Sequence, residues 1–475
     1  MKPDIIFYQQ YAVPYFGILS LDSHLKQHGL HADVLIHTLE KDPIEALKKN
    51  KPGLVGISLM SPEHNWLIQT TAAIRKALPE TRIIIGGIHS ILYYQEILRD
   101  TCADMVCHSE GEKVLVQVIE ELKRDVPQWE NIPGLAYRDD AGNICVNERA
   151  ELVPFSDEII EDRDIYFKRY PELIKDSTHR FFSSRGCPYR CSFCYNAVIH
   201  DTFKGKGRYV RQKTVDNFIQ EILSQTRKYS FSSIYFYDDL FTYNEKWLLS
   251  FLERYRKEIK IPFMCTTRAN VINETVAQAL GEAGCRTVSF GVETGNYDLR
   301  KKVLNKHITN EQIIECGRLL KKYGMKIQTT NMFCLPDETL SDAYKTVEIN
   351  HKAHSDYAFT ALFMPFPNTA LANYCIEKGY LKKDYSLKDM PYSFLTESVL
   401  SLPDKEKIIN LHRLAYFFIR WRWLYKLFYR LPAWNAFTPL YRLIFVMANF
   451  LRHKEERGIS FWSAVRYAWR LRKSL

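Results

Sequence analysis

Short apolar runs alternate with helical patterns through the first part of the chain. The runs that are rich in β-branched and aromatic residues lie at 4–8, 32–37, 53–58, 82–87 and 104–108. Between them apolar residues recur at helical spacing, as in NWLIQTTAAIRKALP. Strands that alternate with helices of this length predict βαβ units and a parallel, doubly wound sheet. The segment GLAYRDDAGNICVN predicts a closing β-hairpin, so we place the end of the first domain near residue 150.

A second series of strands and helices follows an acidic, irregular segment at 151–178, which we interpret as a linker. Its candidate strands begin with RFFSSRG and continue at 233–239, 262–268, 287–293, 326–333 and 357–365. Six βα units predict a partial (β/α)6 barrel over 179–370, with chemistry at the carboxyl ends of the strands. Residues 371–475 are predicted to be helical. The expected fold class is α/β: a doubly wound Rossmann-like domain, a partial TIM barrel and a helical C-terminal region.

Positive charge is concentrated toward the C-terminus. The 475-residue chain has a net charge of +10, and residues 411–475 hold 13 Lys or Arg but 2 Asp or Glu. This segment also holds five of the eight Trp, and Pro432 and Pro439 divide it. It fits amphipathic helices on an anionic bilayer surface, or a helical cap whose aromatic residues form core and substrate pocket. Nucleic-acid binding fits the charge, but the segment carries no motif for it.

Several features indicate a cytoplasmic protein. The opening MKPDIIFYQQ lacks the apolar core of a signal peptide, and no uncharged apolar run is long enough to span a bilayer. The 11 cysteines are odd in number and mostly scattered singly. That pattern argues against a disulfide framework and for a reducing compartment. We therefore expect a cytoplasmic protein, with peripheral membrane contact through 411–475 as one interpretation of the basic segment.

Three cysteines stand close together within SSRGCPYRCSFCYN, at Cys187, Cys191 and Cys194. A structural zinc site uses four protein ligands. A [4Fe–4S] cluster uses one thiolate for each iron, so three cysteines leave one iron open to an outside ligand. Gly186 and Pro188 favour a loop in which the sulfur atoms can converge. A zinc loop with a distant fourth ligand is the alternative.

The spacing C-x3-C-x2-C, with an aromatic residue before the last cysteine, resembles the signature of radical S-adenosylmethionine (SAM) enzymes. The resemblance implies that SAM chelates the open iron. It also implies that one electron from the reduced cluster cleaves SAM to a 5′-deoxyadenosyl radical. Phe193 matches the aromatic position, and Tyr195 follows where adenine contacts are expected. A reductant such as flavodoxin or ferredoxin would supply the electron.

Later strand ends resemble other parts of this family. The candidate SAM contacts there are Tyr237, Asp238, Asp239, Arg268 and Glu293. The first three resemble an acidic motif that receives the ammonium group of SAM, since carboxylates suit a cation. An N-cap role for one of the two Asp is the alternative. Glu293, in GVETG, resembles the ribose-binding strand. Arg268 could pair with the SAM carboxylate or lie on the surface.

The first domain, placed before such a barrel, resembles the cobalamin-binding subclass of the family, and the resemblance covers about residues 1–370. The tentative cobalamin contacts are Ser58, Ser61, His64, Gly86, Gly87, His89, Glu110 and Gly111. Glycines at a strand end let the backbone approach a large ligand closely. A doubly wound domain whose loops bind nothing is the alternative.

Some motifs depart from the family pattern. DSHLKQHG differs from the axial-ligand motif D-x-H-x-x-G in spacing and in its place on a helix, so we expect cobalamin to bind without a His from that loop. FCLPDETLSD stands where Gly-hydrophobic-Pro-Gly-Glu-Thr is usual, with Cys334 and Asp337 replacing small residues. The role of Cys334 stays open. PFPNTAL has Asn368 in place of a Gly, and Asn tolerates a left-handed turn.

These features together predict a cobalamin-dependent radical SAM enzyme that methylates an unactivated carbon of a small-molecule or lipid-like substrate. One SAM would remethylate cob(I)alamin, and a second would yield the radical that abstracts a hydrogen atom. The first alternative is radical cyclisation or oxidation by an enzyme of the same architecture. The second is an iron–sulfur redox or binding protein without turnover.

Overall fold

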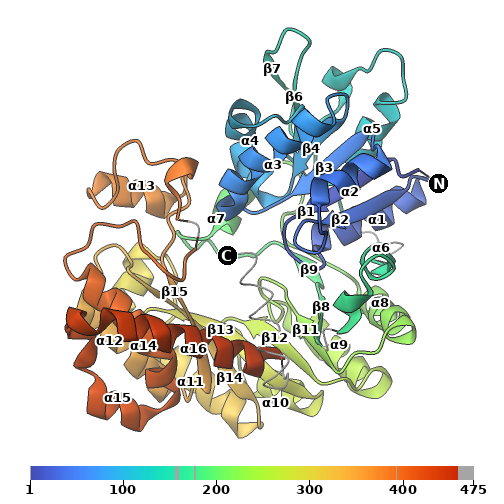
Figure 1. Cartoon of the computed structure of the whole chain (residues 1–475). Helices are drawn as coiled ribbons and strands as arrows, with labels where there is room; N and C mark the ends of the chain where they lie inside the picture. The colour runs from blue at the N-terminus through green and yellow to red at the C-terminus, as the bar shows by residue number, and fades with distance from the viewer. Residues whose placement is uncertain (1, 156–159, 176–177, 392, 458–475) are drawn as a thin grey trace. The chain divides into compact units, whose positions relative to one another are not determined.

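The computed structural model describes residues 2–155, 160–175, 178–391 and 393–457. The chain forms two compact units (Figure 1). The N-terminal unit comprises Met1–Asp176 and Val198–Tyr229, and the C-terminal unit comprises Ser177–Ala197 and Ser230–Leu475.

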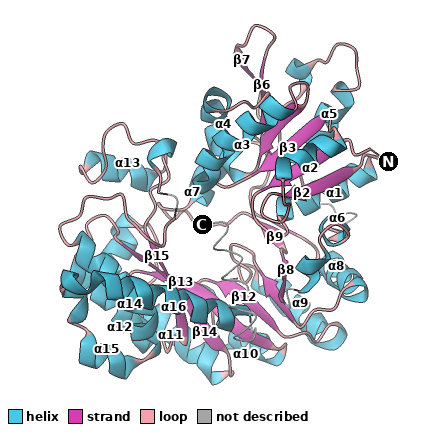
Figure 2. Ribbon diagram, in the orientation of Figure 1, coloured by secondary structure: helices cyan, strands magenta, loops and turns pink. Residues whose placement is uncertain are grey.

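The N-terminal unit is built on a seven-stranded sheet of order β2-β1-β3-β4-β5-β6-β7 (Figure 2). Its strands are β1 (Ile5–Gln9), β2 (Ala32–Ile36), β3 (Leu54–Ser58), β4 (Arg82–Gly86), β5 (Met105–Cys107), β6 (Leu135–Arg138) and β7 (Ile144–Val146). Strands β1 to β5 are parallel, and β6 and β7 form an antiparallel hairpin. The predicted doubly wound sheet and closing hairpin are confirmed. The order reverses at β1, and sheets of this kind bind ligands at the carboxyl edge beside such a reversal.

Helices cover both faces of this sheet. They are α1 (Phe16–Gln27), α2 (Pro43–Asn50), α3 (His64–Ala77), α4 (Ile88–Asp100), α5 (Gly111–Glu121) and α6 (Asp164–Phe167). The unit also contains α8 (Val215–Lys228) and the short turns η1 (Ser61–Glu63), η2 (Trp129–Asn131) and η3 (Pro171–Lys175). Ile5 and Phe7 of β1 pack with residues of α1 and α5. Ile6 and Tyr8 point the other way and pack with residues of α2, α3 and α4. Because both faces are buried, the strands read as continuous apolar runs.

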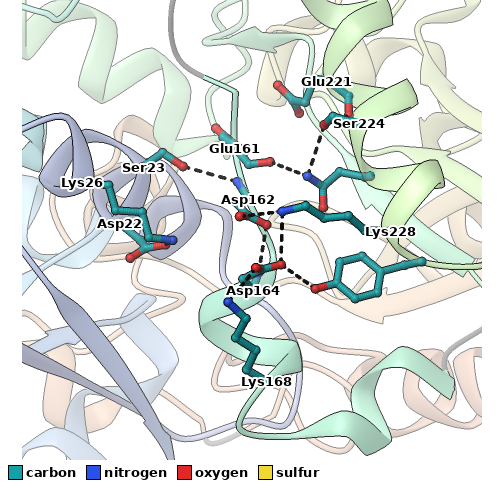
Figure 3. Close-up of polar contacts among 12 residues, drawn as sticks. Asp22, Ser23, Lys26, Glu161, Asp162, Asp164, Lys168, Glu221, Ser224 and Lys228 are labelled. Carbon is teal, nitrogen blue, oxygen red and sulfur yellow. Dashed lines mark hydrogen bonds and ion pairs between the residues drawn. The ribbon is translucent and has the colours of Figure 1, made fainter. Parts of the chain in front are cut away.

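The segment predicted as a linker folds onto the N-terminal unit (Figure 3). The backbone N–H of Asp162 donates to Ser23 Oγ on α1 at 3.3 Å. Lys228 of α8 pairs with Asp162 at 2.9 Å, and the Tyr229 hydroxyl donates to Asp164 at 2.6 Å. The acidic residues that suggested a linker are therefore partners of two helices. Helix α8, which the predicted barrel range included, belongs to this unit as well.

The C-terminal unit contains a six-stranded parallel sheet of order β15-β14-β13-β12-β11-β8. Its strands are β8 (Thr178–Phe181), β11 (Ser233–Phe236), β12 (Phe263–Thr267), β13 (Cys285–Glu293), β14 (Lys326–Phe333) and β15 (Tyr357–Leu362). Each strand pairs with the one before it in the chain. The predicted partial barrel of six βα units is confirmed. Short strands β9 (Ser184–Arg185) and β10 (Arg211–Gln212) lie outside both sheets.

Four helices that follow strands of the C-terminal sheet begin at side-chain caps. The helices of the C-terminal unit are α9 (Glu245–Glu258), α10 (Glu274–Glu282), α11 (Asn310–Lys322), α12 (Leu340–Lys352), α13 (Ala370–Glu377), α14 (Lys405–Arg420), α15 (Arg422–Phe428) and α16 (Thr438–Arg457). Helix α7 (Tyr195–Thr202) is divided by the unit boundary after Ala197. Short turns are η4 (Ala269–Val271), η5 (Leu299–Val303, a π-helical turn), η6 (Leu387–Asp389), η7 (Leu431–Ala433) and η8 (Asn435–Phe437). Asn244, Asn273, Thr309 and Thr339 cap α9 to α12 by accepting backbone N–H bonds. These caps fix the residue at which each helix begins, after the carboxyl end of the preceding strand.

The basic C-terminal region begins with a buried helix. Residues 408–419 of α14 are all buried, and the helix packs on β15, α12 and α16. Pro432 lies in the first turn of η7 and Pro439 is the second residue of α16, so the predicted breaks are confirmed. No helix among the described residues is long and apolar enough to cross a bilayer. Residues 458–475 lie outside the described part of the chain.

Candidate functional site

Three thiols lie on the loop that joins β9 to α7. Cys191 is 8% exposed, and Cys187 and Cys194 are partly buried. Burial raises the pKa of the Cys187 thiol to about 11 and that of Cys194 to about 12, and the nearby Cys191 adds a smaller upward effect to both. Such thiols become thiolates at neutral pH when a metal centre displaces their protons.

The spacing of the three thiols bears on the kind of metal centre that they can hold. In the part of the chain that the structure describes, no three His, Cys, Asp or Glu side chains are spaced to ligate one metal ion. Cysteines that each ligate a different iron of one cluster do not need that close spacing. The three cysteines are therefore compatible with a [4Fe–4S] cluster.

Hydrogen bonds hold the cysteine loop in place. The backbone N–H of Ser192 donates to the carbonyl of Leu304 at 3.0 Å, and its hydroxyl donates to the carbonyl of Val303 at 2.6 Å. The Asn305 side-chain amide donates to the carbonyl of Arg190 at 2.8 Å. The segment after β13 thus positions the loop on both sides of Cys191, the second cysteine.

Arg268 lies against this loop and not on the surface. It is 8% exposed, and its Nη1 donates toward Cys191 Sγ at 3.5 Å. Its guanidinium carbon lies 3.8 Å from the ring centroid of Tyr189, and its Nε donates to Asn270 Oδ1 at 2.9 Å. Arg268 therefore contacts the loop at its second cysteine. Contact between Arg268 and the SAM carboxylate stays a prediction.

Asp238, at the end of β11, has partners within the protein. It is 1% exposed and accepts hydrogen bonds from the Ser183 N–H at 3.0 Å, the Ser183 hydroxyl at 2.8 Å and the Ser184 hydroxyl at 2.5 Å. These bonds tie β11 to the chain that leads into the cysteine loop. Because Asn244 caps α9, the N-cap alternative for either aspartate is wrong.

Asp239 is the acidic residue that faces the thiols. It is open to solvent, although surrounding protein atoms raise the pKa of its carboxyl. Asn196 bonds to this carboxylate and also donates toward Cys194 Sγ at 3.7 Å. Tyr237 beside it is 48% exposed. Asp239 and Tyr237 therefore remain the better candidates for contact with the SAM ammonium group.

The remaining predicted adenine contacts lie on the cysteine loop itself. Phe193 is partly buried, and Tyr195, also partly buried, is the first residue of α7. Their positions beside Cys194 agree with the prediction, which stays untested.

Glu293, at the end of β13, is held by a buried lysine. Its backbone has a left-handed φ of 63° and its side chain is 7% exposed. Oε1 accepts from Lys306 Nζ at 2.6 Å, and the other carboxylate oxygen has no hydrogen bond among the described residues. A Cβ at Gly291 would lie 1.9 Å from Glu293 Oε1 and 2.4 Å from Lys306 Nζ. Glycine therefore leaves room for this pair, and the second oxygen can accept from a ribose hydroxyl.

The loop after β14 contains the residues of the segment FCLPDETLSD that depart from the family pattern, and its backbone conformation is left-handed at two of them. Cys334 and Asp337 have left-handed φ values of 57° and 62°, at the two positions where the family pattern has glycine. Asp337 accepts hydrogen bonds from the hydroxyls of Tyr374 and Tyr380, which hold its loop. Cys334 is fully buried, and burial raises the pKa of its thiol. Asn368 also has a left-handed φ, of 64°, as expected for Pro-Asn-Thr.

Glu338 is expected to make stability depend on pH. It is 2% exposed, and burial raises the pKa of its carboxyl to about 8. The folded chain therefore keeps a proton that the unfolded chain releases near pH 4.5. The free energy of unfolding should fall as the pH rises from about 4.5 to about 8. Denaturant unfolding at both ends of this range should show that Glu338→Gln loses much of the decline, whereas exposed Glu377→Gln keeps it. Equal slopes for the two variants would contradict the assignment.

Two glycines after β4 leave the backbone accessible at the carboxyl edge of the N-terminal sheet. A Cβ added to Gly86 would meet no atom within 4 Å. Gly87 has a φ of 91°, and a Cβ there would lie 2.9 Å from Leu59 O and from Ser58 Oγ. The chain thus turns tightly after β4 and presents its backbone beside β3, which fits the close approach of a large cofactor.

The two predicted histidines of this edge bond to each other. His64 is 1% exposed and His89 is fully buried, and His64 Nδ1 lies 3.0 Å from His89 Nε2. His89 Nδ1 lies 3.1 Å from Ser61 Oγ, and His64 Nε2 lies 3.5 Å from Asp100 Oδ2. Burial and the neighbouring His64 lower the pKa of His89 to about 3. Both imidazoles therefore belong to the domain interior and not to a cobalt ligand site.

Glu110 and Gly111 have partners within the N-terminal unit. Glu110 forms a bidentate pair with Arg211, with nitrogen–oxygen distances of 2.5 and 2.7 Å, and accepts from the Val153 N–H at 2.7 Å. A Cβ at Gly111 would lie 3.1 Å from the Leu21 side chain. Their contact with cobalamin stays a prediction.

Two family models match the chain in the two regions just described. The B12 binding domain matches residues 6–119, and the Radical SAM superfamily matches residues 181–349. The protein is therefore a radical SAM enzyme with a B12-binding domain. Its cofactors are a [4Fe–4S] cluster, SAM and cobalamin.

Three known proteins illustrate the similarity. An uncharacterized methyltransferase of Pyrococcus horikoshii is 28% identical over 74% of this chain and 75% of its own length. An anaerobic magnesium-protoporphyrin IX monomethyl ester cyclase of Rubrivivax gelatinosus is 23% identical over 73% of this chain and 63% of its own length. The structure of the radical SAM methyltransferase TsrM from Kitasatospora setae, with cobalamin and a [4Fe–4S] cluster bound, aligns with a TM-score of 0.66 and 17% identity. That alignment covers 79% of this chain and 75% of TsrM, and it shows a shared fold.

Proposed function

We propose that the protein methylates an unactivated carbon of a small-molecule or lipid-like substrate. The observation that carries the proposal is the set of three thiols beside Arg268 on a barrel whose chain also contains a B12-binding domain. When bound, the cluster supplies an electron, SAM supplies a radical and a methyl group, and cobalamin carries a methyl group.

Each group of residues has a stated part in this activity. Cys187, Cys191 and Cys194 hold the cluster, and the Arg268 guanidinium contacts Cys191. Glu293, oriented by Lys306, accepts from the ribose of SAM. Asp239 and Tyr237 bind the SAM ammonium group. A flavodoxin or ferredoxin serves as the electron donor.

Methylation is favoured over cyclisation by similarity to a methyltransferase of Pyrococcus horikoshii over three quarters of both chains. The similarity to a cyclase of Rubrivivax gelatinosus keeps oxidative cyclisation as the second candidate. The two reactions use SAM differently, because cyclisation has no need for its methyl group.

The products of SAM distinguish the candidates. The holoenzyme is incubated without oxygen with dithionite, methyl-labelled SAM and an extract of small molecules and lipids. We expect 5′-deoxyadenosine and S-adenosylhomocysteine in comparable amounts, with the label in a new product measured by mass spectrometry. Deoxyadenosine with no S-adenosylhomocysteine would favour the cyclase. The absence of both would contradict an enzyme, and Cys191→Ala is the control for background cleavage.

A further inference from the structure

A row of apolar side chains faces solvent along η8 and α16. The exposed fractions are 57% for Trp434, 43% for Phe437, 51% for Leu440, 67% for Leu443 and 50% for Met447. These five residues, here called the apolar stripe, recur every three or four positions and therefore lie on one side of the segment. A surface helix of a globular protein usually turns polar residues outward. An exposed apolar face made of five large side chains marks an interaction surface.

The stripe belongs to a helix that is firmly packed on its other side. Tyr441 is 1% exposed and Ala448 is 2% exposed. The Phe445 ring lies 4.9 Å from the ring of buried His412 on α14, and the Tyr441 hydroxyl donates to the carbonyl of Leu431 at 2.8 Å. The apolar face therefore points outward while the helix stays docked.

A cavity of about 450 Å³ opens beside the stripe. Its lining residues are Leu395, Thr396, Glu397, Arg413, Arg442, Phe445 and Val446. Arg413 is 6% exposed and lies on α14, whereas Arg442 is exposed and lies on α16 next to Leu443. The cavity and the stripe therefore share α16.

The two arginines of the cavity share it with one carboxylate, Glu397, and neither arginine is paired with it. Neither has an ion pair among the described residues, and Arg413 Nη1 donates to Asn410 Oδ1 at 3.0 Å. Burial and the nearby Arg442 lower the pKa of Arg413, while the charge of Glu406 acts in the opposite direction. The sequence from 411 to 454 contains no Asp or Glu. Two guanidinium groups this close together suit an anion such as a phosphate.

We propose that this surface docks on an anionic phospholipid bilayer. A headgroup phosphate enters the cavity between Arg413 and Arg442, and the stripe enters the boundary between headgroups and acyl chains. Exposed tryptophan, leucine and basic residues on one helical segment are the composition that interfacial helices use. The proposal goes beyond the methylation proposed above and does not depend on which reaction the enzyme catalyses.

Vesicle flotation of the holoenzyme tests the proposal. The chain should float with vesicles of phosphatidylcholine mixed with phosphatidylglycerol, and much less with phosphatidylcholine alone. Arg413→Gln with Arg442→Gln should weaken binding about 30-fold, since each arginine near an anionic surface contributes about fivefold. Leu443→Ser with Met447→Ser should weaken it by at least about tenfold through lost apolar contact. Glycerol phosphate in solution should not compete, because the bilayer supplies both contacts.

A variant that binds vesicles more strongly than the unaltered chain provides a further test, because misfolding would not strengthen binding. Glu397 lines the cavity and opposes an anion, so Glu397→Gln should strengthen flotation about fivefold. The matched control is Arg286→Gln with Lys326→Gln, which removes two exposed charges at the starts of β13 and β14 and should change flotation little. Equal loss in the control and cavity variants, or no binding by the unaltered chain, would overturn the proposal. So would a dimer in solution that the stripe variants abolish, because a second copy would then cover the stripe.

Discussion

Replacing Cys187, Cys191 or Cys194 by alanine should abolish the [4Fe–4S] cluster. Each of these thiols serves one iron. Burial raises the pKa of the Cys187 and Cys194 thiols. The expected result is a loss of nearly all iron and sulfide from anaerobically reconstituted protein, with loss of the broad visible absorption of the cluster. The measurement is iron and labile sulfide per chain together with the absorption spectrum.

The matched control is Cys316→Ala on α11. Cys316 is 1% exposed and burial also raises the pKa of its thiol, but it lies outside the cysteine loop. The variant should retain the full iron content. Iron retained at the level of the unaltered protein in any of the three loop variants would contradict the assignment of that cysteine.

Gly291→Ala should weaken SAM binding about tenfold to a hundredfold while leaving the fold intact. The added Cβ would collide with Glu293 Oε1 and Lys306 Nζ, both at the ends of flexible side chains. The collision should displace the carboxylate that accepts from ribose, and a lost hydrogen bond to a charged group costs about 1.5–3 kcal/mol. Equilibrium dialysis of SAM against the cluster-loaded protein measures the change.

Two other glycines provide the comparison. A Cβ at Gly53 meets nothing within 4 Å, so Gly53→Ala should change neither SAM affinity nor stability. A Cβ at Gly295 would lie 2.1 Å from the backbone carbonyl of Lys345, so Gly295→Ala should lower the melting temperature markedly. Unchanged SAM affinity in Gly291→Ala would show that Glu293 does not contact the cofactor. A melting temperature as low as that of Gly295→Ala would show that Gly291 serves the fold.

Most strands of the two sheets were predictable because they are apolar and largely buried. Their apolar runs and the helices between them identify the parallel order without knowledge of any contact. The cysteine loop was predictable for a different reason, since the three ligands lie within one short segment. The left-handed Asn368 could be anticipated because asparagine tolerates that conformation.

Residues that act through partners distant in sequence were not predictable. Lys306 contacts Glu293 from 13 positions away, and Tyr189 of the cysteine loop stacks on Arg268. Asn196 joins Cys194 to Asp239 although nothing in its spacing distinguishes it. The predicted linker failed for a related reason. Its acidic residues look solvent-exposed by composition, but Lys228 and Tyr229 of a later segment bind them.

The electron paramagnetic resonance spectrum of the reduced cluster, recorded before and after addition of SAM, tests the central claim most directly. If three cysteines hold the cluster and leave one iron open, SAM should ligate that iron and change the g values of the reduced cluster. The Gly291→Ala variant should need more SAM for the same change. A spectrum that saturating SAM leaves unaltered, in protein with full iron content, would contradict the account.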